Sequence, residues 1–157
     1  MTTFISHRPE ETAALGERWG REAAHGAVIG LTGDLGAGKT LLVKGFARGL
    51  DITAPVLSPT FALVHEYREG RLPLFHLDLF RLETRRQIID AGLEEFLFQP
   101  PGIAVVEWIE RWLGDLRSPH GAASPGQRPG LPRWYKQVWI ETMGETERRI
   151  SYEDFGA

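Results

Sequence analysis

The sequence of 157 residues contains no cysteine. Disulfide bonds and thiolate metal sites are therefore excluded, and this absence fits a reducing compartment. Basic charge is also limited, because the formal net charge is −3. Proteins that bind nucleic acid over a broad surface are usually basic, so we do not expect that class of function.

Long apolar runs are missing as well. No stretch approaches the roughly 20 apolar residues of a membrane-spanning helix. The first 20 residues lack the basic region and apolar stretch of a signal peptide. We therefore expect a cytoplasmic protein without membrane contact. The length suits a single domain over residues 1–157, with no internal repeat.

One long segment has little that could pack. Residues 117–133 contain four prolines and three glycines and almost nothing apolar. A segment too polar to bury surface stays outside the core. The sequence therefore predicts a flexible loop at about 114–133.

Apolar patterning elsewhere predicts an α/β fold. Residues 27–33 (AVIGLTG) and 102–108 (GIAVVEW) are continuous apolar runs, typical of buried parallel strands. Helical spacing marks three further segments, the last of which is broken near Gly92: 8–24, 39–50 and 83–98. Residues 2–6 are expected to form a short strand.

Two β-hairpins are also expected, because alternating segments come in adjacent pairs. The first joins 61–67 to 72–80 through the turn residues REG, and the second joins 134–142 to 147–154. These hairpins argue against a purely parallel sheet.

Lysine is scarce, with three residues against fifteen arginines, yet one lysine stands in a distinctive place. GDLGAGKT (33–40) matches the P-loop pattern, with Gly33, Gly38, Lys39 and Thr40 in the defining positions. Glycines let successive N–H groups point at phosphate oxygens, and the following helix directs its positive end at the same anion. The predicted fold is therefore an α/β, P-loop NTPase-like three-layer sandwich. Its mixed sheet has parallel core strands flanked by antiparallel hairpins.

A P-loop needs a second, metal-orienting carboxylate, usually at the end of a neighbouring buried strand. Glu107 ends IAVVE and is the first candidate. Asp78 is the other, and alternation places it on one strand face with His76. An ordinary solvated strand face explains His76 and Asp78 equally well. LSPTF (57–61) carries a threonine of the kind that senses a γ-phosphate on mobile loops, although a proline turn before a strand explains it too.

Four motifs occur in register in this short chain, namely GDLGAGKT (33–40), SPTF (58–61), HLDLFR (76–81) and VEW (106–108). In this order and spacing they resemble the TsaE family, formerly called YjeE. Its members are small bacterial ATPases needed for the threonylcarbamoyl modification of adenosine 37 in tRNA (t6A). The resemblance runs from about residue 8 to residue 112, and more weakly to the C-terminus.

The resemblance implies binding and hydrolysis of ATP with Mg²⁺, in complex with the partner proteins TsaB and TsaD. That pair transfers threonylcarbamoyl from an adenylate onto tRNA, and hydrolysis by TsaE resets it between turnovers. Contact with tRNA is then indirect, through the complex.

The motif match also implies roles for single residues. Positions 36–41 would contact the phosphates, and Thr40 and Glu107 would hold Mg²⁺. Asp78 would position water or metal. The implied catalytic residues are Lys39, Asp78 and Glu107. Thr12 matches a position near the base, Thr60 a switch-like segment, and Trp108 a place beside the nucleotide. The implied nucleotide-binding residues are Thr12, Gly33, Gly36, Ala37, Gly38, Lys39, Thr40, Leu41, Thr60 and Trp108.

The chain departs from the family pattern at Phe80, where HxDxYR carries tyrosine, so Phe80 is assigned a packing role only. The loop at 114–133 is longer than the family's usual link. Arg148 or Arg149 is a candidate nucleotide contact, with no choice made between them.

Two other functions compete with the ATPase. Segment 117–133 bears arginines and would suit the lid of a small-molecule kinase, while a nucleotide-gated binding module would need no turnover. Efficient P-loop hydrolysis commonly uses an arginine at the γ-phosphate, and none lies in GDLGAGKT, LSPTF or VEW. Arg81 is the nearest candidate, but strand alternation places it opposite His76 and Asp78. We therefore expect weak hydrolysis alone and activation by a partner.

Overall fold

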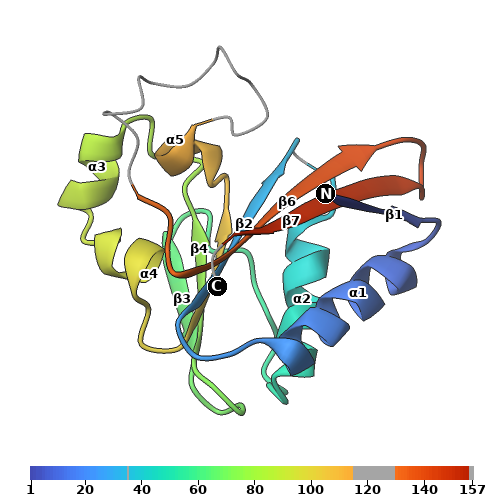
Figure 1. Ribbon diagram of the computed structural model, residues 1–157, viewed down its shortest axis with the longest axis horizontal. Helices are drawn as coiled ribbons and strands as arrows, with labels where there is room; N and C mark the ends of the chain where they lie inside the picture. The colour runs from blue at the N-terminus through green and yellow to red at the C-terminus, as the bar shows by residue number, and fades with distance from the viewer. Residues whose placement is uncertain (35, 115–129, 156–157) are drawn as a thin grey trace.

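The computed structural model describes residues 1–34, 36–114 and 130–155. Figure 1 shows its mixture of helices and strands. The strands are β1 (Thr2–Ser6), β2 (Ala27–Gly33), β3 (Val64–Tyr67), β4 (Leu74–Asp78), β5 (Ile103–Glu107), β6 (Trp134–Thr142) and β7 (Arg148–Phe155). The helices are α1 (Pro9–Glu22), α2 (Lys39–Gly49), α3 (Arg85–Asp90), α4 (Glu94–Phe98) and α5 (Glu110–Leu113).

The strands form one mixed sheet in the order β1-β7-β6-β2-β5-β4-β3. Strand β2 is parallel to both β5 and β6, and β4 is parallel to β5. Both predicted hairpins are confirmed, since β3 pairs with β4 and β6 with β7 in antiparallel fashion. The parallel core is wider than expected, because one strand of each hairpin joins it.

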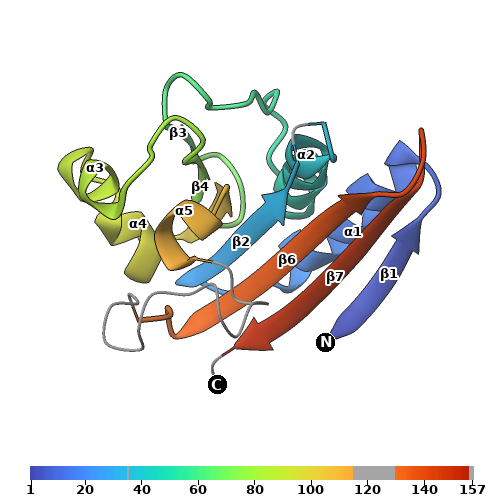
Figure 2. The same cartoon turned by 90° about the horizontal axis from the view of Figure 1, so that it is seen from above.

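Helices cover both faces of the sheet, as the view from above shows (Figure 2). Alternation along β2 sends Ile29 and Leu31 into a core cluster with α1 and α2. Val28 belongs to a second cluster that includes Ile88, Leu97 and further residues of the α3–α5 side. The predicted three-layer arrangement is confirmed by these two apolar layers.

Glycines let α1 and α2 approach closely. A Cβ atom at Gly16 would lie 2.3 Å from the carbonyl oxygen of Leu42, and one at Gly45 would lie 2.0 Å from that of Ala13. Backbones can meet at this distance only where side chains are absent. This contact fixes α2, which begins at the end of the P-loop.

Several predicted boundaries were wrong. Strand β3 begins at Val64 rather than at residue 61, because Leu63 adopts a left-handed conformation (φ 71°) after a turn. Strand β4 spans Leu74–Asp78 rather than 72–80. The break expected near Gly92 in the helical segment 83–98 is confirmed, since Gly92 (φ 77°) separates α3 from α4.

Most of the predicted loop at 114–133 lies outside the described residues. Among the helices that the structure describes, none is both long and apolar enough to cross a membrane.

Candidate active site

Three parallel strands end at one edge of the sheet and bring the predicted polar residues together there. Strand β2 ends at Gly33, β4 at Asp78 and β5 at Glu107. The sheet register pairs Glu107 with Asp78 on one side and with Leu31 on the other. Ligands of open α/β sheets bind at this carboxyl edge.

The P-loop follows β2 and has the backbone that its glycines permit. Gly36 (φ 78°) and Gly38 (φ 105°) both lie in the left-handed region, which is costly for residues with a side chain. Helix α2 starts directly afterwards at Lys39, so its amino end faces the loop. Unpaired N–H groups at such an end attract anions.

The Lys39 side chain lies under this loop. Its ammonium group donates to the carbonyl oxygen of Gly33 and, at 2.8 Å, to that of Asp34. The nitrogen also lies 4.5 Å from the ring centroid of Trp108. Burial lowers the pKa of Lys39, and the carboxylate of Glu107 is the strongest of the nearby charges that oppose this shift.

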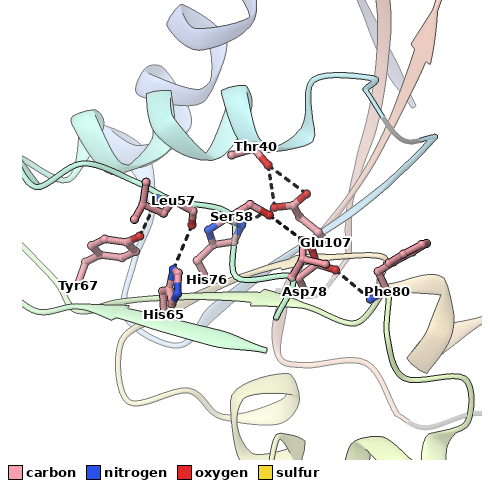
Figure 3. Close-up of polar contacts among 10 residues, drawn as sticks. Thr40, Leu57, Ser58, His65, Tyr67, His76, Asp78, Phe80 and Glu107 are labelled. Atoms are coloured by element: carbon pink, nitrogen blue, oxygen red, sulfur yellow. Dashed lines mark hydrogen bonds and ion pairs between the residues drawn. The ribbon is translucent and has the colours of Figure 1, made fainter. Parts of the chain in front are cut away.

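Glu107 stands between the P-loop helix and β4, as Figure 3 shows. The Thr40 hydroxyl donates to its Oε2 at 3.3 Å and its Oε1 at 3.5 Å. The ring nitrogen Nε2 of His76 lies 2.5 Å from the same Oε2. Glu107 is 3% exposed and His76 is 0% exposed, so neither is a solvated surface group.

Asp78 is likewise buried, which decides the open question of the strand face that it shares with His76. Its Oδ2 accepts from the Thr60 hydroxyl at 2.8 Å, and its Oδ1 accepts from the backbone N–H of Phe80 at 2.9 Å. The Ser58 hydroxyl lies 2.8 Å from that of Thr60. This hydroxyl pair links the SPTF stretch to the buried carboxylates.

Side chains from β3 hold the segment before Thr60. The backbone N–H of Leu57 donates to the Tyr67 hydroxyl at 3.1 Å. Its carbonyl oxygen lies 3.1 Å from Nδ1 of His65 and accepts a hydrogen bond from it. Figure 3 shows both contacts with the backbone of Leu57. The turn expected in LSPTF is present, since the backbone N–H of Leu63 donates to the carbonyl oxygen of Pro59 at 2.7 Å, while the role in sensing a γ-phosphate stays a prediction.

Trp108 follows β5 in a left-handed conformation (φ 61°), which is strained for a residue with a side chain. Its backbone N–H donates to the carbonyl oxygen of Leu31 at 3.0 Å. The ring packs against Phe80 with centroids 5.0 Å apart, which confirms the packing role expected of Phe80.

These groups enclose a cavity of about 260 Å³. Its lining residues are Gly36, Gly38, Lys39, Thr40, Leu41, Ser58, Thr60, Asp78, Glu107 and Trp108. Nine of them were predicted, and Ser58 was missed although SPTF places its hydroxyl two residues before that of Thr60.

Three predicted residues do not line this cavity. Gly33 and Ala37 belong to the P-loop around it. Thr12 is buried on α1, where its hydroxyl lies 2.7 Å from that of Ser6. Its predicted role near a base stays a prediction.

The arginine candidates separate clearly. Arg148 donates from Nε to the carbonyl oxygen of Ala37 at 3.0 Å, so it touches the P-loop, whereas Arg149 pairs with Glu141 at 3.3 Å. Strand β4 ends before Arg81, so the alternation argument does not apply there. Instead, the Arg81 guanidinium lies 4.9 Å above the Phe61 ring.

A buried polar chain behind the P-loop was also missed. Gln137 donates to the Thr32 hydroxyl at 2.9 Å, and Thr32 donates to Oε2 of Glu110 at 3.0 Å. The Tyr135 hydroxyl donates to Gln137, and burial raises its pKa. Burial also raises the pKa of Glu110, against the opposing effects of its own backbone N–H, Thr32 and Lys39. The sequence signal that could have identified Glu110 is its position two residues after VEW.

A larger cavity of about 400 Å³ lies at the opposite end of β2, between α1 and the β6–β7 hairpin. Apolar and aromatic side chains such as Trp19 and Phe46 form much of its wall. Its Lys136 and Asp154 pair with each other at 2.8 Å. It therefore has neither the phosphate loop nor the converging carboxylates of the smaller cavity.

Comparison with known proteins gives a direct match for this arrangement. The family model described as threonylcarbamoyl adenosine biosynthesis protein TsaE matches residues 6–125. The chain belongs to the TsaE family. Among its relatives, a TsaE protein of a Nostoc species is 49% identical over 114 residues, covering 71% of this chain and 70% of the relative. The Bacillus subtilis TsaE protein is 39% identical over 148 residues, covering 94% and 82%.

A solved structure shares the fold of this chain. The crystal structure of YdiB from Bacillus subtilis aligns with a TM-score of 0.71 at 35% identity. The alignment covers 96% of this chain and 83% of YdiB. Both curated relatives are named tRNA threonylcarbamoyladenosine biosynthesis protein TsaE.

Proposed function

We propose that this chain is a Mg²⁺-dependent ATPase that serves t6A synthesis at tRNA position 37 together with the TsaB–TsaD pair. One observation carries the enzymatic part of the proposal. The hydroxyl of Thr40, from the P-loop helix, and the carboxylate of Glu107, from a neighbouring parallel strand, meet within 3.5 Å. These are the two protein positions from which P-loop enzymes hold their metal ion.

The donor chemistry fits Mg²⁺. A hydroxyl and a carboxylate are hard oxygen ligands, and Mg²⁺ usually takes only one or two protein groups beside waters and phosphate oxygens. Within the described ranges, no group of three or more histidine, cysteine or acidic side chains converges as a metal cage. Mg²⁺ needs no such cage.

The phosphates of ATP would be held by the P-loop. The left-handed turns at Gly36 and Gly38 and the amino end of α2 are suited to direct N–H groups at phosphate oxygens. Lys39 would add a charge-assisted contact. Its ammonium group has three donors, and the carbonyl oxygens of Gly33 and Asp34 take two of them.

Hydrolysis transfers the γ-phosphoryl group of ATP to water and yields ADP and phosphate. Mg²⁺ would supply neutralisation of the phosphate charge when bound. Within the chain, Glu107 and Thr40 orient that ion, and the Asp78 carboxylate positions water at the cavity wall. The hydroxyl of Thr60, which is hydrogen-bonded to Asp78, would respond to the γ-phosphate.

We expect hydrolysis to depend on a partner because the site, among the residues that the structure describes, lacks an arginine at the γ-phosphate. In the described part of the chain, the cavity wall includes Lys39 but no arginine. An arginine supplied by a partner is worth roughly 10³–10⁵ in rate in other P-loop enzymes. Because the chain has a net charge of −3, tRNA contact through the complex is the consistent arrangement.

Phosphate release by the purified chain, with and without reconstituted TsaB–TsaD and Mg²⁺, tests the proposal. We expect slow release alone, strong stimulation by the pair, and loss of both when Mg²⁺ is chelated. If the chain alone turns over at about 10 per second, an ordinary enzyme rate, and the pair adds nothing, the partner-dependent function is wrong. Phosphorylation of an added small acceptor would instead support the kinase.

A further inference from the structure

His76 is a buried polar residue that no step above uses. Its ring is 0% exposed, and the sheet register places it between Val105 of β5 and His65 of β3. Its single described polar contact is the short one between Nε2 and Oε2 of Glu107. Its other ring nitrogen, Nδ1, is buried and has no hydrogen-bond partner among the residues that the structure describes.

We propose that His76 is a positioning residue that fixes the Glu107 carboxylate in the orientation that binds Mg²⁺. The inference rests on the proposed function, because it concerns the same site. His76 touches neither ATP nor the reacting atoms, and it acts through Glu107.

The two oxygens of Glu107 are not used equally. Oε2 accepts from His76 at 2.5 Å and from Thr40 at 3.3 Å, whereas Oε1 has only the 3.5 Å contact with Thr40. A carboxylate held firmly by one oxygen keeps its other oxygen in a defined place. Oε1 is therefore the oxygen left for the metal ion or for a water bound to it.

The unpaired nitrogen supports a functional role for the ring. A buried polar atom without a partner destabilises the fold, so an apolar side chain would serve the core better at this position. Where a buried group breaks this rule, a functional reason is expected. Partners that orient a metal-binding carboxylate are a common reason.

The proposal also specifies a proton position. An ionised carboxylate only accepts hydrogen bonds, so Nε2 must carry the hydrogen and donate to Oε2. Nitrogen NMR of the metal-free protein reads this directly, without any substitution or turnover. The opposite tautomer, with hydrogen on Nδ1 alone, would overturn the proposal.

Two substitutions test the role in metal binding. His76→Leu removes the donor, whereas His76→Gln offers an amide N–H at similar reach. Calorimetry gives the Mg²⁺ concentration that half-saturates the ATP complex, and also the affinity for ADP in EDTA. Loss of an orienting partner typically costs 10–100-fold in metal affinity. We therefore expect His76→Leu to raise the Mg²⁺ requirement about 10–100-fold, His76→Gln to recover most of it, and ADP affinity in EDTA to stay within about twofold.

Leu77→Val is the matched control, because Leu77 lies next to His76 on the same strand but packs on the opposite face. It should lower thermal stability without changing the Mg²⁺ requirement. An equal rise in the Mg²⁺ requirement for Leu77→Val and His76→Leu would show that His76 is merely structural, and the inference would fail.

The outcomes also separate this inference from the proposed function. If the wild-type chain binds ATP without any dependence on Mg²⁺, both are wrong. If wild-type binding depends on Mg²⁺ and folded His76→Leu retains the wild-type requirement, only the inference is wrong. If His76→Leu fails to fold, the tautomer of His76 and the Mg²⁺ requirement of His76→Gln decide whether the inference holds.

Discussion

The buried carboxylates and the segment 57–63 reach the same cavity but are held in different ways. Asp78 and Glu107 stand at the ends of paired parallel strands and are 3% exposed. Segment 57–63 contains no helix or strand, and its Leu57 and Phe61 are 64% and 84% exposed. Contacts from β3 and from Asp78 hold it at separate points.

This difference separates two tasks within one site. Strand ends fixed by backbone pairing can keep carboxylates in place before a ligand arrives, which metal binding and catalysis require. A segment held by a few side-chain hydrogen bonds can exchange those partners for a phosphate at small cost. We infer that the carboxylates at the strand ends bind the metal ion and that segment 57–63 senses the γ-phosphate.

The largest effect should come from Glu107 on the fixed side. Glu107→Gln keeps the shape and the hydrogen bonds to Thr40 and His76 but removes the charge that orients Mg²⁺. We expect turnover per bound ATP to fall roughly 100-fold or more, as when one stabilising group is lost at a transition state. ADP affinity in EDTA should remain. Single-turnover phosphate release measures this, and unchanged turnover with equally weakened ADP and ATP would contradict it.

Lys39→Ala should have the next largest effect, on binding. A charge-assisted contact of about 1.5–3 kcal/mol corresponds to a loss of roughly 10–150-fold in ATP affinity. The fold should persist, because alanine is favourable at the start of α2. Calorimetry measures the affinity, and Lys44→Ala on the exposed side of α2 is the control. Equal ATP affinity in Lys39→Ala and Lys44→Ala would contradict the assignment of Lys39 to phosphate binding.

Thr60→Ala should act through segment 57–63 and more weakly. It loses the hydroxyl contacts with Asp78 and Ser58. One hydrogen bond of about 1.4 kcal/mol corresponds to about a tenfold change, so turnover of ATP should fall by that factor. ADP affinity should not change, and Thr60→Ser should restore turnover. A Thr60→Ala variant that loses ADP and ATP affinity equally would argue that this segment is a fixed wall.

The smallest effect concerns pH and Glu110. Because burial raises its pKa above 4.5 in the folded state, the native chain binds more protons than the unfolded chain just above pH 4.5. The contribution of Glu110 to the free energy of unfolding is therefore present at lower pH and is lost as pH rises through the raised value. Glu110→Gln should remove this slope from melting curves recorded across pH, whereas exposed Glu94→Gln should leave it. Parallel wild-type and Glu110→Gln curves would refute the prediction.

The sequence predicted the P-loop and the end of β5 better than the rest of the site. A ligand-free glycine turn and a solvent-facing glutamate were the alternatives for GDLGAGKT and IAVVE, but the strand–loop–helix context of the P-loop favoured a site. Lys39, Thr40 and Glu107 could therefore be placed at a parallel-strand edge. His76 and Asp78 remained ambiguous, because alternation gives a face and cannot say whether helix α2 covers it. Burial of both residues depends on that long-range packing.

The other contacts that the sequence did not predict also depend on long-range packing. The hydrogen bonds of His65 and Tyr67 with Leu57 join residues on separate segments that no local pattern connects. Arg148 reaches the P-loop only because β7 folds back beside it. Glu110 matters through Thr32, which is 78 residues away in the chain. Local periodicity carries no information about such pairs, whereas a motif of fixed spacing such as the P-loop does.

Hydrogen–deuterium exchange of the wild-type chain tests the separation of the two tasks most directly. Exchange is compared for three samples, with Mg²⁺ alone, with Mg²⁺ and ADP, and with Mg²⁺ and a non-hydrolysable ATP analogue. We predict that residues 36–41 gain protection with both nucleotides, whereas residues 57–63 change only with the ATP analogue. Equal responses of 57–63 to ADP and the analogue, or no response of 36–41 to either nucleotide, would contradict the account.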